Sequence, residues 1–303
     1  MDKNYIKDRE QRVELQGGSS HWRTPPAGVP QGSCLSPLLF SIYVNDLPDV
    51  LPMNADCNLF ADDTTLSTRN KSVKNIQETL QLAVDNANLW FKTSKVKANP
   101  MKTEIILLQT DRQKRENINI NLEGHVLQQA VSHKHLGVRI QQNLRWKEHV
   151  DDICTKANQR LGLLRLLQHN GMPEHCLQRV YNTLVRSTLE YASIVWTPSP
   201  GDSARLEVIQ EKAKKIISSN RTKSCQQMQS LADRRHYQHN KFVNRLVSFD
   251  VPNHLHFYSK LLCNFIDVHS GLNLSVVSCP RTNVGVRSPL FQSVMAASSM
   301  PYI

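Results

Sequence analysis

The sequence predicts an α+β protein, with strands and helices mixed in its first part and helices almost throughout from Trp146 onward. Short runs with strand character alternate with amphipathic stretches in the first part. Long stretches with apolar residues every three to four positions fill the second part. With 40% hydrophobic and 21% charged residues, the 303-residue chain is long enough for one large or two modest cores.

Six elements are expected before residue 109. Apolar residues at helical spacing after Ser36-Pro37 predict a helix that ends near Leu47-Pro48, since proline suits a first helical turn. Two short runs separated only by Asp62 and Asp63 predict a tight hairpin with both carboxylates at its tip. In order, the elements are an extended segment at 11–16 leading into a loop through Gly17 and Gly18, the helix just named, strands at 58–61 and 64–67, an amphipathic helix from Val73 to Trp90, and a strand at 103–108.

The second part follows a polar loop at 109–117 and a β-hairpin at 118–140, with Gly124 at one turn and HLGVRI as its second strand. Helical stripes then predict the core, together with Trp146, Trp196 and Tyr191. The stripes run through Val150, Ile153, Ala157, Leu161 and Leu164; through Leu177, Val180, Leu184, Tyr191 and Val195, after Pro173; and through Leu206, Ile209, Ala213 and Ile216. Two weaker helices are expected at 227–249 and 253–268.

The net charge of +11 is confined to the later part of the chain. Of 37 basic and 26 acidic side chains, residues 1–110 hold 12 of each, which leaves 25 basic and 14 acidic ones in residues 111–303. This asymmetry suggests a polyanionic partner, either nucleic acid or an anionic membrane.

Two sequence features bound the class of protein further. No run approaches the roughly 18 apolar residues that span a bilayer, and the charged N-terminus lacks a signal-peptide core, so an intracellular protein is expected. Seven scattered cysteines without a C-x₂-C pair indicate neither a disulfide framework nor a zinc ribbon. Paired histidines, such as His133 with His135, lack partners at zinc-ligand spacing.

Asp62 and Asp63 are the first candidates for chemistry. Adjacent carboxylates at a hairpin tip repel each other and favour a divalent counter-ion. Hard oxygen ligands select Mg²⁺ or Mn²⁺ over zinc, and two-metal phosphoryl transfer uses carboxylates from more than one strand to hold ions about 3.5–4 Å apart. The alternative is a plain aspartate-rich turn, and the dipeptide taken alone favours it.

The surrounding residues change this balance. The segment GVPQGSCLSPLLFSIYVNDLP at 28–48, followed by FADDTTL at 60–66, resembles the palm-domain blocks of reverse transcriptases of non-LTR retrotransposons, the Jockey-like and related LINE-type elements. The order and spacing also match. Further blocks extend the resemblance over essentially the whole chain: YIKDREQRVEL, NLWFKTSKVKANPMKTEIILL, HKHLGVRIQQNLRWKEHV, ANQRLGLLRLL and VYNTLVRSTLEYASIVW.

The resemblance implies a fold and an activity. Residues 1–145 are expected to form a partial reverse-transcriptase palm, an antiparallel sheet with helices, and residues 146–270 an all-α, thumb-like C-terminal region, followed by a poorly ordered tail at 271–303. The implied activity is that of an RNA-directed DNA polymerase with an RNA template, a DNA primer, deoxynucleoside triphosphates and Mg²⁺ or Mn²⁺. The membrane alternative thereby loses weight, and the expected compartment is the nucleus or cytoplasm.

The resemblance also implies roles for individual residues. Asp62 and Asp63 match the metal-binding, catalytic carboxylates of the family's xxDD box. Pro30, Gln31 and Gly32 match the loop beneath the incoming nucleotide and the template base, where glycine lets the backbone approach the substrate closely. Lys102 matches a cation near the phosphates, braced by Asn99 and Thr103, although a solvated lysine in a turn is an equal alternative.

The nucleic acid is expected to meet two further regions. Leu136 and Gly137 match part of the primer-gripping turn. Basic side chains on the later helices suit a surface that follows a phosphate backbone without reading its sequence, although a merely solvated basic face is the alternative for each of them. These side chains are Lys212, Lys214, Lys215, Arg221 and Lys223 in one stretch, and Arg234, Arg235, Lys241 and Arg245 in the next.

One family block has no counterpart in the sequence. A palm of this family carries a further aspartate on an earlier strand, and neither Asp2 nor Asp8 lies in a segment that resembles that block. The fingers region has no counterpart either, so the chain is expected to be a truncated fragment that is feeble or inactive alone. The alternative to a polymerase segment is a catalytically dead relic or a co-opted nucleic-acid-binding protein.

Overall fold

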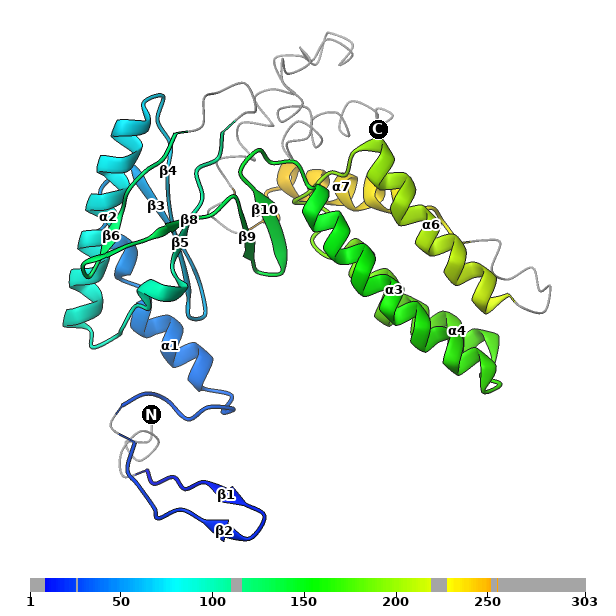
Figure 1. Cartoon of the computed structure of the whole chain (residues 1–303), viewed down its shortest axis with the longest axis horizontal. Coiled ribbons are helices and arrows are strands. Elements are labelled where there is room, and N and C mark those ends of the chain that lie inside the picture. The colour runs from blue at the N-terminus through cyan, green and yellow to red at the C-terminus, as the bar shows by residue number, and fades with distance from the viewer. Residues whose placement is uncertain (1–8, 26, 110–115, 219–227, 252–254, 256–303) are drawn as a thin grey trace. The chain divides into compact units, whose positions relative to one another are not determined.

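The computed structural model describes residues 9–25, 27–109, 116–218, 228–251 and 255 (Figure 1). The chain divides into two compact units. Unit 1 holds Met1–Ile105 and Glu116–Gln129, and unit 2 holds Ile106–Arg115 and Ala130–Ile303. The tail at 271–303, almost all of the helix expected at 253–268 and most of the loop expected at 109–117 lie outside the described residues.

Unit 1 begins with a short hairpin and a helix. Strands β1 (Glu14–Leu15) and β2 (Gly18–Ser19) pair antiparallel, which confirms the extended segment but makes Gly18, expected in a loop, the start of a strand. Helix α1 (Ser36–Val44) begins beside Pro37 as predicted. The 3₁₀ turn η2 (Leu47–Val50) follows, so the helical run ends near the predicted position.

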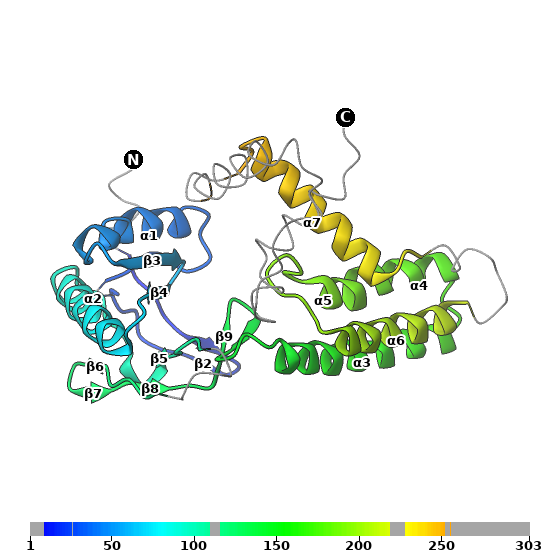
Figure 2. The ribbon, with the colours of Figure 1, turned by 90° about the horizontal axis from the view of Figure 1, so that it is seen from above.

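The core of unit 1 lies between a β-hairpin and a long helix. Strands β3 (Ala55–Phe60) and β4 (Asp63–Thr68) pair antiparallel, and helix α2 (Val73–Thr93) lies along them (Figure 2). Ser72 caps α2, because its hydroxyl accepts a hydrogen bond from the backbone N–H of Asn75. The apolar contacts that join α1, η2, the hairpin and α2 involve Phe40, Val44, Leu47, Cys57, Leu59, Leu66, Ala87 and Trp90.

A group of two-residue strands completes unit 1. Strand β5 (Glu104–Ile105) pairs parallel with β8 (Gln128–Gln129), while β6 (Asn121–Leu122) and β7 (His125–Val126) form a hairpin that turns at Gly124. The side-chain amide of Gln81 on α2 bonds both backbone groups of Asn121, at 2.8 and 3.0 Å. The Gln81 amide therefore makes the two hydrogen bonds that a neighbouring strand would make at Asn121. The strand predicted at 103–108 is shorter than expected.

Unit 2 contains a separate hairpin where the sequence predicted the end of a single hairpin over 118–140. Strand β9 (Ser132–His135) pairs antiparallel with β10 (Val138–Gln141), and the chain turns at Leu136-Gly137. The single hairpin expected over 118–140 is therefore wrong: this stretch holds two hairpins and the parallel strand β8 between them. HLGVRI contains a whole turn, because Leu136 and Gly137 both have positive φ.

Helix α3 (Lys147–His169) is the longest helix of unit 2, and all five residues of its predicted stripe are buried. The second predicted stripe is only partly right. It spans α4 (Glu174–Val180), the π-helix η4 (Tyr181–Arg186) and α5 (Ser187–Glu190). The wider π turn alters the helical period, so the buried residues are Leu177, Tyr181, Val185 and Leu189. Leu184, Tyr191 and Val195 are exposed, and Tyr191 lies beyond the helix.

Two further helices pack on this scaffold. Helix α6 (Pro200–Ile217) buries its whole predicted stripe, and its contacts are mainly with α3. Helix α7 (Leu231–Val247) lies within the weak helix expected at 227–249 and contacts α6. Trp146 and Trp196 are buried in the core of unit 2, as predicted, whereas Tyr191 is 53% exposed.

The prediction of mixed strands and helices followed by helices is confirmed over the described residues. In the part of the chain that the structure describes, four of the five two-stranded sheets are antiparallel, and the β5–β8 pair is parallel. The palm, thumb-like region and domain boundary at residue 145 stay predictions. No helix in the described ranges is both long and apolar enough to cross a membrane.

Candidate functional site

Asp62 and Asp63 lie where β3 turns into β4. The two-residue turn consists of Ala61 and Asp62, whereas Asp63 is the first residue of β4 and pairs with Phe60. The predicted tight hairpin is therefore confirmed, but its tip is shifted by one residue, and Ala61 is not part of a strand. Ala61 has φ +52°, a left-handed conformation that costs a non-glycine residue about 1 kcal/mol or more.

The hairpin presents its acidic end on the side away from the core. Cys57, Leu59 and Leu66 point toward α2 and belong to the core of unit 1. Because side chains alternate along a strand, Phe60 and its pairing partner Asp63 share the opposite face. Both Asp62 and Asp63 are exposed. The packing of the inner face therefore decides on which face Asp63 stands.

The carboxylates of Asp62 and Asp63 meet one requirement of Mg²⁺ or Mn²⁺, because these ions prefer oxygen ligands. Neither Asp62 nor Asp63 forms a side-chain hydrogen bond or an ion pair with any described residue, so their oxygen atoms are available to a cation. Within the described ranges, however, no group of three or more His, Cys, Asp or Glu side chains gathers to hold a metal ion. Two carboxylates from one hairpin are therefore not, by themselves, a complete set of ligands for a metal ion.

Pro30, Gln31 and Gly32 form a turn immediately before α1. The backbone N–H of Ser33 donates to the carbonyl oxygen of Pro30 at 3.4 Å, and Gly32 has φ +86°. The hydroxyl of Ser36, in the first turn of α1, also donates to the carbonyl oxygen of Pro30. No atom lies within 4 Å of a Cβ added at Gly32, so glycine is required here by the backbone angle, and the space beside it is open.

Lys102 ends the 3₁₀ turn η3 (Pro100–Lys102) and is exposed. The side chain of Asn99 accepts from the backbone N–H of Met101 at 3.0 Å, and the hydroxyl of Thr103 donates to the carbonyl oxygen of Asn99 at 2.9 Å. Asn99 and Thr103 thus hold the turn that carries Lys102. The groups at 30–32, 62–63 and 102 all belong to unit 1, but no described hydrogen bond or ion pair joins one group to another.

Leu136 and Gly137 form the β9–β10 turn in unit 2, with φ +44° and +85°. The hydroxyl of Tyr191 donates to the carbonyl oxygen of Leu136 at 2.8 Å. A Cβ added at Gly137 would lie 3.1 Å from Cε1 of Tyr191. Tyr191 therefore covers and fixes this turn from a position 54 residues further along the chain.

The basic side chains of α6 differ in how freely they face solvent. Lys214 is half-buried and forms an ion pair with Glu211 at 2.7 Å. Lys212 and Lys215 are exposed and make no ion pair with a described residue. Arg221 and Lys223 lie outside the described residues. Among the predicted α6 cations, Lys212 and Lys215 are the most available to a phosphate.

Arg234 and Arg235, at the start of α7, are engaged within unit 2. The guanidinium of Arg234 pairs with both carboxylate oxygens of Glu190, one of them at 3.0 Å, and this hydrogen bonding raises its pKa. The guanidinium of Arg235 lies 5.3 Å from the ring centroid of Trp196, and burial lowers its pKa. Both side chains thus attach α7 to the core.

A buried histidine in the same core was not predicted from the sequence. His149 is 1% exposed and packs against the rings of Trp146 and Trp196. Its Nδ1 accepts from the backbone N–H of Arg139 at 3.2 Å, and burial lowers its pKa to about 4. Because the HVDDI segment that begins at His149 is typical of an ordinary helix, nothing in the sequence distinguishes His149 from a surface histidine. Tyr191 was likewise expected in the core, and no local signal links it to Gly137.

Comparison with known proteins gives these groups a context. Residues 2–140 match the family model described as reverse transcriptase (RNA-dependent DNA polymerase). The match contains Asp62, Asp63, the 30–32 turn, Lys102 and the Leu136-Gly137 turn. No solved structure matches the chain.

Relatives carry the similarity beyond residue 140. The chain is 28% identical over 225 residues to the probable RNA-directed DNA polymerase from transposon BS of Drosophila melanogaster, which covers 71% of this chain and 25% of the relative. It is 23% identical over 225 residues to the RNA-directed DNA polymerase from mobile element jockey of the same species (71% and 24%), and 26% identical over 232 residues to that of Drosophila funebris (71% and 24%).

The chain therefore spans about a quarter of the length of these curated relatives. The matched residues include the hairpin with its two exposed carboxylates and both glycine-containing turns. Residues 2–140 are thus similar to the reverse transcriptase family model, and about 71% of the chain is similar to the RNA-directed DNA polymerases from transposon BS and from mobile element jockey.

Proposed function

We propose that this chain is a segment of an RNA-directed DNA polymerase that adds deoxynucleotides to a primer 3′-hydroxyl on an RNA template. The observation that carries the proposal is the β3–β4 turn within the matched residues. Asp62 lies exposed in this turn and Asp63 on the face of the hairpin away from the core, and neither side chain is paired among the described residues. The left-handed Ala61 adds support, since backbone strain is often retained at functional sites.

Asp62 and Asp63 would hold Mg²⁺ or Mn²⁺ through their carboxylate oxygens. Such ions, when bound, assist attack of the primer hydroxyl on the α-phosphate and stabilise the leaving pyrophosphate. The open space beside Gly32 suits close approach of the nucleotide or the template base, and Gln31 offers an amide there. Lys102 would place a positive charge near the triphosphate.

The same observations support a limit on the activity. Two carboxylates from one hairpin are only part of the ligand set of a two-ion site, and two-ion chemistry requires ligands from a further element. We therefore propose that the chain alone is feeble or inactive and that the active enzyme includes a further carboxylate. Without that carboxylate the chain would be a nucleic-acid-binding protein without chemistry, which the exposed cations of unit 2 also fit.

A chimera tests the polymerase role. Residues 2–140 of this chain replace the matching segment of the jockey polymerase of Drosophila melanogaster, and primer extension is measured with Mg²⁺, poly(rA) and oligo(dT). Asp62→Asn or Asp63→Asn is expected to lower the rate by several orders of magnitude. Asp56→Asn is the matched control, because Asp56 is an exposed aspartate of β3 in the same hairpin, at its far end from the turn.

Equal losses in Asp56→Asn and Asp62→Asn would contradict the proposed roles of the two aspartates. The unmodified chain alone is assayed in parallel. Robust synthesis by the chain alone that disappears in Asp62→Ala would show that the proposed inactivity is wrong.

A further inference from the structure

The cations of α7 divide into two groups that do different things. Arg234 and Arg235 are occupied by Glu190 and by the ring of Trp196. Lys241 and Arg245 follow on the second half of the helix and are exposed. Val243 and Leu246 in the same half are buried, so the second half of α7 has an apolar inner side and a basic outer side.

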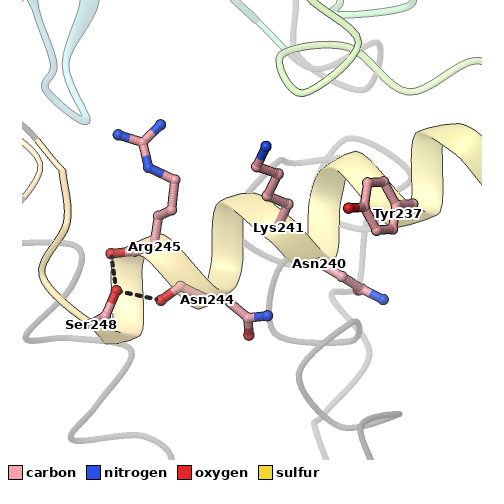
Figure 3. A pocket seen from close by; sticks show the side chains of 6 residues that line it. All are labelled: Tyr237, Asn240, Lys241, Asn244, Arg245 and Ser248. Atoms are coloured by element: carbon pink, nitrogen blue, oxygen red, sulfur yellow. Dashed lines mark hydrogen bonds between the residues drawn. The ribbon is translucent and has the colours of Figure 1, made fainter.

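The outer side of the second half of α7 forms a shallow depression of about 410 Å³. Figure 3 shows Lys241 and Arg245 extending to the same side of the helix, with Tyr237 one turn before Lys241. We call this surface the Tyr237 face. Its lining residues are Tyr237, Asn240, Lys241, Asn244, Arg245 and Ser248.

The aromatic ring and the two cations of the Tyr237 face have unused capacity for a ligand. Tyr237 is 65% exposed and offers a bare aromatic ring. Lys241 makes no ion pair with a described residue. Arg245 uses its Nε–H on Asp250, at 3.0 Å to the carbonyl oxygen and 3.1 Å to the carboxylate, and its terminal amino groups remain for a ligand. Asn244 adds an exposed amide that both donates and accepts, whereas the Oδ1 of Asn240 is buried.

The spacing of these groups suits a polymer of phosphates and bases. Tyr237, Lys241 and Arg245 are four residues apart, so they follow one another at about 6 Å along the helix. Two cations in a row attract consecutive phosphates whatever their sequence. An exposed ring beside them can stack on a base only if that base is not already stacked within a duplex, which favours single strands over duplexes.

We infer that the Tyr237 face binds single-stranded nucleic acid, with Lys241 and Arg245 on phosphates and Tyr237 stacked on a base. If the proposed function holds, the ligand is the unpaired RNA template, and only this identification of the strand rests on that function. The face is distinct from the α6 cations and from Arg234 and Arg235, which the sequence grouped with it.

Fluorescence anisotropy tests the inference on the full chain, with labelled oligouridylate, labelled oligodeoxythymidylate and a labelled RNA–DNA hybrid duplex. Tyr237→Ala is expected to weaken binding to both single strands by about fivefold or more and to leave duplex binding within about twofold. Tyr237→Phe is expected to retain the wild-type affinity, because its ring stacks equally well.

The cations are tested by the salt dependence of single-strand binding. The double variant Lys241→Gln, Arg245→Gln is expected to flatten the slope of log K against log salt by about 1.4, about 0.7 for each phosphate contact on a single strand. The double variant Lys156→Gln, Arg165→Gln is the matched control, since both residues are exposed cations on α3 of the same unit. Circular dichroism checks that all variants fold.

Three results would overturn the inference: an equal change of slope in the α3 control, an unchanged affinity in Tyr237→Ala, or a larger loss for the duplex than for the single strands. These readouts are independent of catalysis. Absence of Asp62-dependent extension in the chimera, with intact single-strand binding, would remove the assignment to the RNA template and leave single-strand binding by the Tyr237 face standing. Failure of binding with intact Asp62-dependent extension would refute the face alone.

Discussion

Gly137→Ala tests whether the Leu136-Gly137 turn is held by Tyr191. Gly137 has φ +85°, so any Cβ costs about 1–2 kcal/mol in backbone strain. The added Cβ would also meet the Tyr191 ring at 3.1 Å, and displacing the ring weakens the bond between its hydroxyl and the carbonyl oxygen of Leu136. Loss of that bond adds about 1 kcal/mol. The expected total is therefore about 2–3 kcal/mol.

Urea unfolding followed by circular dichroism measures this loss. Gly171→Ala is the matched control, because Gly171 lies in the same unit with φ +78° and has no atom within 4 Å of an added Cβ. It is expected to lose only the backbone term. In a Tyr191→Ala background, the cost of Gly137→Ala is expected to fall to that of Gly171→Ala. If the two glycine substitutions cost the same in the wild type, or if the cost at Gly137 is unchanged without Tyr191, the reasoning is refuted.

Three further predictions concern other parts of the chain. His149 has a pKa of about 4 in the folded state against 6.5 in the unfolded state, so the unfolded chain binds more protons between these pH values. The free energy of unfolding should therefore fall as the pH drops from about 6.5 toward 4, by up to about 3 kcal/mol. Urea midpoints of His149→Gln should show a flatter pH profile. The pKa of His239 is also lowered by burial, so a residual slope of the same sign should remain in that variant. Ala61→Gly should raise the stability of unit 1 by about 0.5–1 kcal/mol in urea unfolding, because glycine relieves the left-handed strain; a loss of stability would contradict the assigned turn. Gln81→Leu should cost about 1–3 kcal/mol and speed amide hydrogen exchange at Asn121, which loses its side-chain partner; Gln81→Glu should keep the bond to the Asn121 N–H, and unaltered exchange in Gln81→Leu would argue against the contact.

Much of the secondary structure could be predicted because its causes are local. The α2 helix has a capping serine, a clear apolar stripe and no interior proline, and the stripes of α3 and α6 are buried as predicted. The hairpin at Asp62 and Asp63 was also predictable, since two β-rich runs so close together leave room only for a tight turn. Its one-residue shift was not, because register depends on which face packs against α2.

The errors lie where distant residues decide the local structure. The hairpin expected over 118–140 is divided because β8 pairs with β5, more than 20 residues earlier, and because Gln81 bonds the strand at Asn121. The stripe through Tyr191 was misplaced because a π turn at Tyr181–Arg186 changes the helical period. Neither a side-chain amide that replaces a strand nor a π turn has a reliable sequence pattern.

The candidate site shows the same division. Motif order and spacing were sufficient to predict the resemblance that the comparisons bear out, because such motifs are contiguous in the sequence, whereas the roles of the aspartates and of both turns stay predictions. The sequence did not indicate which cations remain available to a ligand. Arg234 and Arg235 look the same in sequence as Lys241 and Arg245, yet the first pair contacts Glu190 and Trp196 and the second pair faces outward.

The residue types, their order and the periodicity of apolar positions were thus enough for most of the elements and for the basic second part, whereas the chemistry of Asp62 and Asp63 stays a prediction. Packing alone decided the face on which Asp63 stands, the attachment of Tyr191 to Gly137 and the fate of each arginine on α7. The physical reason is that hydrophobic periodicity acts over neighbouring residues, whereas burial and pairing of a polar side chain depend on groups that the chain brings together from far apart.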